Sequence, residues 1–188
     1  MLTSLSGVAF GEGDPEAGER LAYTCMGCHG VVGYRNAYPS FRVPRLGGQR
    51  EEYLIDALKA YRENRRQHPT MQAQGGSLSD QDIEDIAAWL QGSEPADDTV
   101  TAEEVAGFDA IQTCLACHGV GGAAVIPKPP VLSGQYADYL VHALKQYKSG
   151  QRSGNVMNAF AANLDEDDME QVAEFYSTRP GVVTPEKK

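Results

Sequence analysis

Two copies of one pentapeptide contain all four cysteines of the chain, at residues 25–29 and 114–118. Each reads Cys-x-x-Cys-His. Two thiols at this spacing can form thioethers with the two vinyl groups of one porphyrin, and the adjoining histidine then lies beneath the iron. The motif therefore predicts two covalently attached heme c groups. The predicted attachment residues are Cys25, Cys28, Cys114 and Cys117, and the predicted proximal iron ligands are His29 and His118.

Three other uses of paired cysteines fit this sequence less well. A thioredoxin-like redox pair needs a βαβ context, which neither copy has. A structural zinc site needs four ligands, and neither copy is followed by the paired ligands of a zinc finger. Disulfide bonds of a secreted domain would leave the repeated histidine unexplained. Heme attachment is the interpretation that uses every residue of the motif.

The two pentapeptides belong to a longer internal repeat. Residues 44–71 align with 130–157 at an offset of 86, and twelve of the 28 aligned positions are identical. The offset between the two histidines is 89, so the first copy carries three extra residues between its histidine and its proline. We therefore predict two tandem domains, at 1–91 and 100–188. The linker is expected at 92–99, and residues 1–11 could be a signal-peptide remnant.

The repeat also indicates the second iron ligand, because the same coordination in both halves calls for equivalent positions. Met71 and Met157 are equivalent. His68 and His142 have no histidine counterpart in the other half, and we interpret both as non-ligands. Met169 aligns with an isoleucine and is expected in the core. Ligation of both irons by His and Met raises the reduction potential and leaves no position open for a substrate.

Apolar side chains recur at helical spacing, and no stretch has the alternation of a strand, so the chain is predicted to be all-α. Each half is expected to run in the order helix, heme motif, loop, helix, methionine loop, helix. The middle helices carry apolar stripes over 53–61 and 139–147. Helix starts are expected at Asp14 with Pro15, at the capping box Thr101-x-x-Glu104, at Ser79-x-x-Asp82 and at Asp165.

Charge and hydropathy exclude two classes of function. The 188 residues include 16 Lys and Arg against 26 Asp and Glu, a net charge of −10, which is the wrong sign for a protein that neutralises phosphates of nucleic acid. No apolar run approaches the roughly 18 to 20 residues of a membrane-spanning helix. Segments 42–66 and 128–152 are each net +3. Those basic side chains either balance heme propionates or steer a redox partner.

The two halves differ most between the heme motif and the following proline. The first half has three tyrosine or phenylalanine and two arginine residues within 31–43, whereas 120–129 is mostly small and apolar. Two interpretations stay open. The aromatic residues either pack over the first heme, or, together with Arg35, form a docking surface for one partner.

Taken together, the two heme motifs, the Pro-x-Leu-x-Gly-Gln segments and the Met71 and Met157 segments resemble the diheme cytochromes c of the cytochrome c4 type. The resemblance covers nearly the whole chain and implies two class I cytochrome c domains, each wrapped around one heme. It also implies that the carbonyl groups of Pro44 and Pro130 accept hydrogen bonds from His29 and His118, which would tune the irons.

By the same resemblance the protein is expected in the bacterial periplasm, often at the membrane. It would carry electrons from a quinol-oxidising complex toward a cbb3-type terminal oxidase or another periplasmic oxidoreductase. Two alternatives stay open: the heme subunit of a larger dehydrogenase such as a flavocytochrome, and a diheme enzyme. An enzyme would need an open iron or an extra cysteine ligand, and neither is indicated, so no catalytic residue is predicted.

Overall fold

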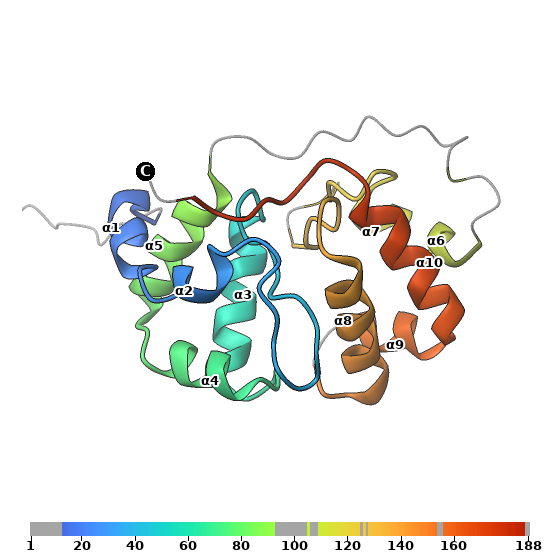
Figure 1. Cartoon of the computed structure of the whole chain (residues 1–188), viewed down its shortest axis with the longest axis horizontal. Helices are drawn as coiled ribbons and strands as arrows, with labels where there is room; N and C mark the ends of the chain where they lie inside the picture. The colour runs from blue at the N-terminus through green and yellow to red at the C-terminus, as the bar shows by residue number, and fades with distance from the viewer. Residues whose placement is uncertain are drawn as a thin grey trace, which may run out of the picture.

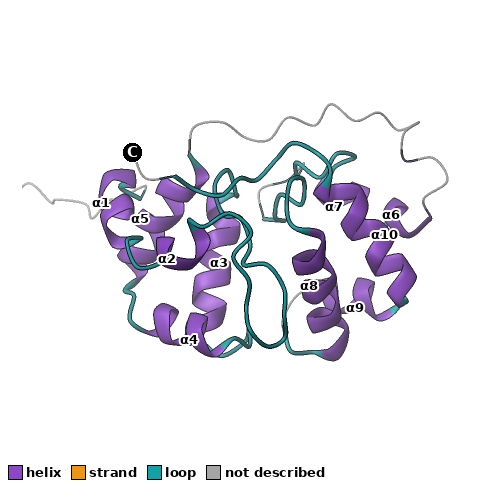
Figure 2. Ribbon diagram, in the orientation of Figure 1, coloured by secondary structure: helices purple, strands orange, loops and turns teal. Residues whose placement is uncertain are grey.

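The computed structural model describes residues 13–92, 105, 109–124, 126, 128–153 and 156–186, and its regular elements are all helices (Figure 2). The predicted all-α fold is confirmed. The expected signal-peptide remnant at 1–11, the linker after residue 92 and the capping box at 101–104 lie outside the described residues. No helix among those described is long and apolar enough to cross a membrane.

The first half is built around the closing helix α5, Asp80–Gln91, which packs on α1, Pro15–Leu21, and on α3, Glu51–Arg62. As expected, Asp14 caps α1 and Pro15 begins it. The close approach of α1 to α5 requires Gly18, since a Cβ there would lie 2.0 Å from the Asp85 carbonyl oxygen. The heme motif forms a short helix of its own, α2, Met26–His29.

The second half repeats this plan. Helix α8, Ala137–Ser149, packs on α9, Met157–Ala162, and on the closing helix α10, Glu166–Ser177. The heme motif again forms a short helix, α7, Leu115–His118, which follows α6, Asp109–Gln112. Both closing helices begin with a capping box, Ser79 with Asp82 and Asp165 with Asp168.

The methionine segments, which we expected to be loops, are helical. Met71 lies in α4, Pro69–Gly76, and Met157 is the first residue of α9. Helix α4 begins because Pro69 occupies its first position and the ring Nδ1 of His68 accepts a hydrogen bond from the Met71 amide at 3.3 Å. A histidine N-cap is unusual, and the sequence pattern did not reveal it.

Each half buries a small apolar core. Met169 is fully buried in the second half, as expected. The first core contains Ala22, Leu54, Ile86, Ala87 and Leu90. The second contains Val105, Ile111, Leu140, Val172, Ala173, Phe175 and Tyr176.

The halves lie side by side (Figure 1). Arg66 and its repeat equivalent Arg152 form an antiparallel β-bridge where the halves meet. After α10 the chain returns over the interface, and Val183 forms a second bridge with Gly47, with N–H to O distances of 2.9 Å in both directions. The C-terminal segment 179–186 thus contacts both halves.

Candidate functional site

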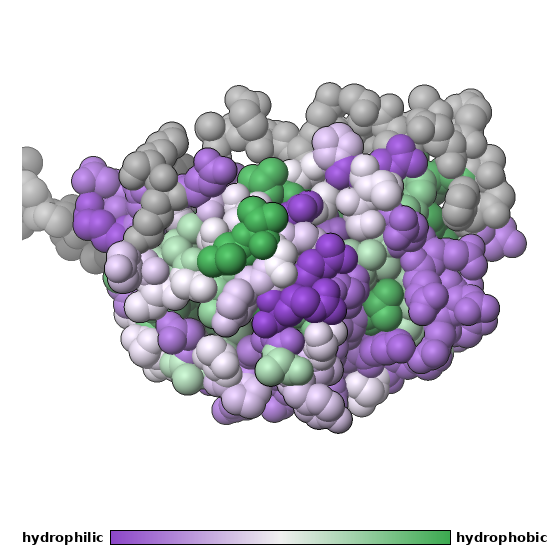
Figure 3. All heavy atoms as spheres, viewed as in Figure 1, coloured by the Kyte–Doolittle hydropathy of each residue, from purple (hydrophilic) through white to green (hydrophobic). Residues whose placement is uncertain are grey.

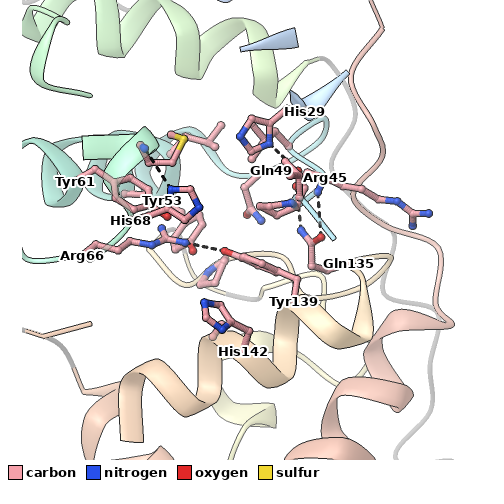
Figure 4. A pocket seen from close by; sticks show the side chains of 18 of the residues that line it. His29, Arg45, Gln49, Tyr53, Tyr61, Arg66, His68, Gln135, Tyr139 and His142 are labelled. Atoms are coloured by element: carbon pink, nitrogen blue, oxygen red, sulfur yellow. Dashed lines mark hydrogen bonds between the residues drawn. The ribbon is translucent and has the colours of Figure 1, made fainter. Parts of the chain in front are cut away.

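One cavity of about 670 Å³ extends through both halves and collects the residues singled out in the sequence (Figure 4). It lies between the heme motifs and the helices that carry the methionines. Cys117 is half-buried and is not among its lining residues. The predicted site residues that line it are Cys25, Cys28, His29, Pro44 and Met71 from the first half, and Cys114, His118, Pro130 and Met157 from the second.

Both motif histidines are held in one orientation by a proline carbonyl. Nδ1 of His29 lies 2.8 Å from the Pro44 oxygen, and Nδ1 of His118 lies 3.0 Å from the Pro130 oxygen. A carbonyl only accepts, so Nδ1 is protonated in each ring and Nε2 keeps its lone pair. Burial lowers the pKa of both imidazoles, although the proline carbonyls oppose this shift. Each ring is therefore a neutral ligand with Nε2 available for a metal.

No disulfide joins any two of the four cysteines, so the disulfide interpretation gains no support. Burial raises the pKa of Cys25 and of Cys114, so these groups stay protonated near neutral pH. A zinc site needs thiolates and further ligands nearby. Among the described residues, no three His, Cys, Asp or Glu side chains gather closely enough to hold a metal ion. The donor set therefore does not fit a zinc site.

The spare histidines also line the cavity, but their rings contact other groups. Nε2 of His68 lies 3.3 Å from the side-chain oxygen of Asn36, while its Nδ1 caps α4. The ring of His142 stacks on Phe41, with 4.0 Å between centroids and 15° between planes. These contacts give both histidines structural roles.

The charges around the cavity suit an apolar ligand with carboxylate groups. Four arginines and no Asp or Glu are among its lining residues, in a chain whose net charge is −10. Arg66 and Arg152 are buried, and both donate to the Tyr139 hydroxyl, at 2.7 and 3.2 Å. The Arg66 Nε has no hydrogen-bond partner within the described structure. A porphyrin has an apolar ring and two propionates, so the residues present fit heme.

The loop at 31–43 reaches the second half, an arrangement that neither sequence interpretation anticipated. Phe41 is only 5% exposed and packs against Tyr139 and His142. Arg35 pairs with Asp138 at 3.0 Å, whereas Tyr38 is 97% exposed. Apolar side chains on the face around α2 and this loop remain visible at the surface (Figure 3). The segment 31–43, in which the first copy has three extra residues, therefore bridges the two halves.

Two glutamines at the interface belong to the internal repeat, but the sequence did not predict that they join the two halves. Gln49 and Gln135 close the Pro-x-Leu-x-Gly-Gln segments and are almost fully buried. Gln49 bonds to the backbone of Val131, and Gln135 bonds to the backbone of Arg45 (Figure 4). Their identity in both copies was the available signal, but nothing in the sequence indicated that their partners lie in the other half.

Two family models match successive parts of the chain. The family model described as cytochrome c matches residues 15–94, and the model described as cytochrome c oxidase, cbb3-type, subunit III matches 102–175. Cytochrome c4 of Pseudomonas aeruginosa is 31% identical over 190 residues, which is 93% of each chain. A thiosulfate dehydrogenase electron acceptor of Stutzerimonas stutzeri is 31% identical over 173 residues, 83% of this chain and 79% of that protein.

Solved structures show the same arrangement. Reduced recombinant cytochrome c4 from Pseudomonas stutzeri superposes with a TM-score of 0.71 at 28% identity, covering 89% of this chain and 100% of that chain. Thiosulfate dehydrogenase from Marichromatium purpuratum also has a TM-score of 0.71, at 29% identity, covering 88% of this chain and 40% of that chain. Two tandem domains, each with a cysteine pair, are consistent with two covalent heme c groups.

Proposed function

This chain belongs to the cytochrome c4 family of diheme electron carriers, and from that premise we propose that His29 and Met71 bind one heme iron while His118 and Met157 bind the other. The observation that carries the proposal is the repeated arrangement around one cavity. In each half, a histidine with its Nδ1 fixed by a proline carbonyl shares the cavity wall with a methionine at the equivalent repeat position.

The bound hemes would supply the one-electron change, and the chain's own residues would set its conditions. Cys25 with Cys28, and Cys114 with Cys117, would form the thioethers. Pro44 and Pro130 would orient the proximal histidines and increase their basicity. The apolar wall excludes water, while buried Arg66 and Arg152 would offset propionate charge. With a histidine and a methionine holding each iron, the protein would carry electrons without acting on a substrate.

The partners proposed here are periplasmic redox proteins. A quinol-oxidising complex as donor and a cbb3-type oxidase as acceptor remain the respiratory proposal, and location in the periplasm is supported by the cytochrome c4 relatives. A second donor is favoured by a specific observation. Relatives from Thiomonas intermedia and Stutzerimonas stutzeri are named thiosulfate dehydrogenase electron acceptors, at 29% and 31% identity. Reduction kinetics with each purified donor would choose between them.

The ligand proposal is tested by opening one iron at a time. Met71→Ala and Met157→Ala are each expected to convert one heme to the high-spin form and lower its potential, because the methionine ligand that raises the potential is lost. His68→Ala and His142→Ala serve as controls and should leave both hemes low-spin. Absorption spectra report the spin state, after mass spectrometry under denaturing conditions has shown two heme additions. A high-spin heme in His68→Ala, with Met71→Ala unchanged, would overturn the assignment.

A further inference from the structure

Two buried glutamines connect the halves by reciprocal pairs of hydrogen bonds. The side-chain amide of Gln135 donates to the Arg45 carbonyl oxygen at 2.9 Å, and its oxygen accepts from the Arg45 backbone N–H at 3.0 Å. Gln49 forms the same pair with Val131, at 3.0 and 2.8 Å. Gln49 is 3% exposed and Gln135 is 4% exposed, so water does not compete for these groups.

The two backbone N–H groups lie in the same peptide units as the carbonyls that hold the proximal histidines. The Arg45 N–H and the Pro44 C=O belong to one planar amide. One side of that amide therefore donates to Gln135, while the other accepts from Nδ1 of His29 at 2.8 Å. The Val131 N–H and the Pro130 C=O form the corresponding amide, which joins Gln49 to His118, with the Nδ1 to oxygen distance at 3.0 Å.

Hydrogen bonds in such a chain polarise one another. An acceptor on the amide N–H increases the negative charge on the carbonyl oxygen, which strengthens the bond that the oxygen accepts, by about 10 to 30% per bond. A stronger bond at Nδ1 makes the imidazole a more basic ligand. In each half, the peptide amide that accepts a hydrogen bond from the proximal histidine is thus polarised by a glutamine of the other half.

We propose that Gln135 is a positioning residue for the His29 heme and that Gln49 is one for the His118 heme, so that each domain tunes the reduction potential of its neighbour's heme. The inference rests on the proposed histidine ligation of the two irons. It adds a function to the domain interface: docking of the halves completes the hydrogen-bond chain behind each proximal ligand. Separating the halves would remove both chains together.

The sign of the effect distinguishes tuning from simple loosening of the interface. Without Gln135, His29 becomes a weaker donor to iron, the ferric state loses stabilisation and the potential of the first heme rises. We expect an equilibrium shift of about threefold, which is roughly 30 mV for a one-electron couple. Water entering a loosened interface would act in the opposite direction, because a polar medium favours the more highly charged ferric site.

The test uses Gln135→Met and Gln49→Met in the diheme protein, since methionine fills a similar volume without either hydrogen bond. Gln146→Met is the matched control. Gln146 is also buried in the second half, and its amide also donates across the interface, to the Gln67 carbonyl oxygen at 3.4 Å, but it has no link to a proline–histidine pair. Its oxygen accepts from Arg152 Nε at 2.8 Å, so this control is read from the His29 Nδ1–H signal and not from the potentials. The readouts are the two reduction potentials and the ¹⁵N NMR signals of both Nδ1–H groups in the ferrous protein. Every sample must first show two covalent hemes and low-spin spectra.

A crossed pattern supports the proposal. Gln135→Met should raise the potential of the first heme and move the His29 Nδ1–H signal. Gln49→Met should raise the potential of the second heme and move the His118 Nδ1–H signal. Gln146→Met should leave the His29 signal in place. The proposal is overturned if a variant shifts the potential of the heme in its own half instead, if the potential falls, or if the Nδ1–H signal does not move. If the variants do not fold, hydrogen exchange of the intact protein still decides: the Arg45 and Val131 amides must exchange as slowly as the helix cores, and rapid exchange overturns the proposal. If the unmutated protein itself lacked two hemes or low-spin spectra, that result would instead refute the ligand assignment.

Discussion

Asp138 is expected to hold the two domains together, and replacing it should lower the free energy of unfolding by an amount that follows from its contacts. Its carboxylate accepts from the Arg42 side-chain Nε at 3.0 Å and from the Arg42 backbone N–H at 3.1 Å, and it pairs with Arg35 at 3.0 Å. All of these partners belong to the first half. Asp138→Ala therefore removes every one of these contacts between the halves.

The two arginines are more than a third exposed, so screening limits each ion pair to about 0.5 kcal/mol. The backbone hydrogen bond to the half-buried carboxylate contributes about 1.5 kcal/mol. The sum is about 2.5 kcal/mol, or about a 70-fold change in an equilibrium constant. For a chain of this length the thermal midpoint should fall by about 5 to 10 °C if the halves unfold together.

Glu52→Ala is the matched control, because Glu52 is the repeat equivalent of Asp138. Each is the second residue of its helix, α3 or α8, so the loss of a favourable charge near the helix N-terminus is the same for both. Glu52 is exposed. Calorimetry of the diheme protein should therefore show a clear deficit for Asp138→Ala beyond that of Glu52→Ala. At about 1 M salt the ion-pair part of the deficit should vanish, since the screening length is then about 3 Å. Equal midpoints for the two variants would refute the reasoning.

Two further predictions concern stability. Asp165→Ala removes the side chain that caps α10 and accepts from the Asp168 amide at 2.8 Å, so urea unfolding should show a loss of about 1 kcal/mol with unchanged heme spectra; no measurable loss would show that the cap is dispensable. Burial, followed by the charge of Arg152, lowers the pKa of His142 to about 4. The unfolded chain then binds more protons than the folded one between about pH 6.5 and pH 4, so stability should fall as the pH falls through that window. His142→Gln should weaken that dependence in thermal melts, and identical pH profiles would contradict the assignment.

Much of the site could be predicted from local sequence, because its chemistry depends on close spacing. The thiols and the histidine of each motif are neighbours along the chain, so the backbone alone brings Cys25, Cys28 and His29 together. The repeat then related Met71 to Met157 and Pro44 to Pro130 without any structure. The capped starts of α1 and α5 followed from Asp14 with Pro15 and from Ser79, because a cap acts within one helical turn.

The methionine segments show where local patterns failed. Pro69 is a recognised helix-start residue, but the cap that completes α4 comes from a histidine ring, a residue type outside the usual capping set. Helix α9 begins at Met157 without a side-chain cap, so no local signal marked it. Short helices of this kind depend on packing against α3 and α8 more than on intrinsic propensity.

What only the tertiary structure decided is how the two copies meet. Residues 31–43 could be recognised as the divergent stretch, but not as the one that places Phe41 against the second half. Gln49 and Gln135 were visible as repeated residues, yet their partners lie 82 and 90 positions away. The repeat relates each residue to its equivalent, and it contains no information on the rotation that docks one copy on the other. That rotation depends on the complementary surfaces of both copies, so the hydrogen bonds that link Gln135 to His29 through the Pro44–Arg45 amide exist only in the folded pair.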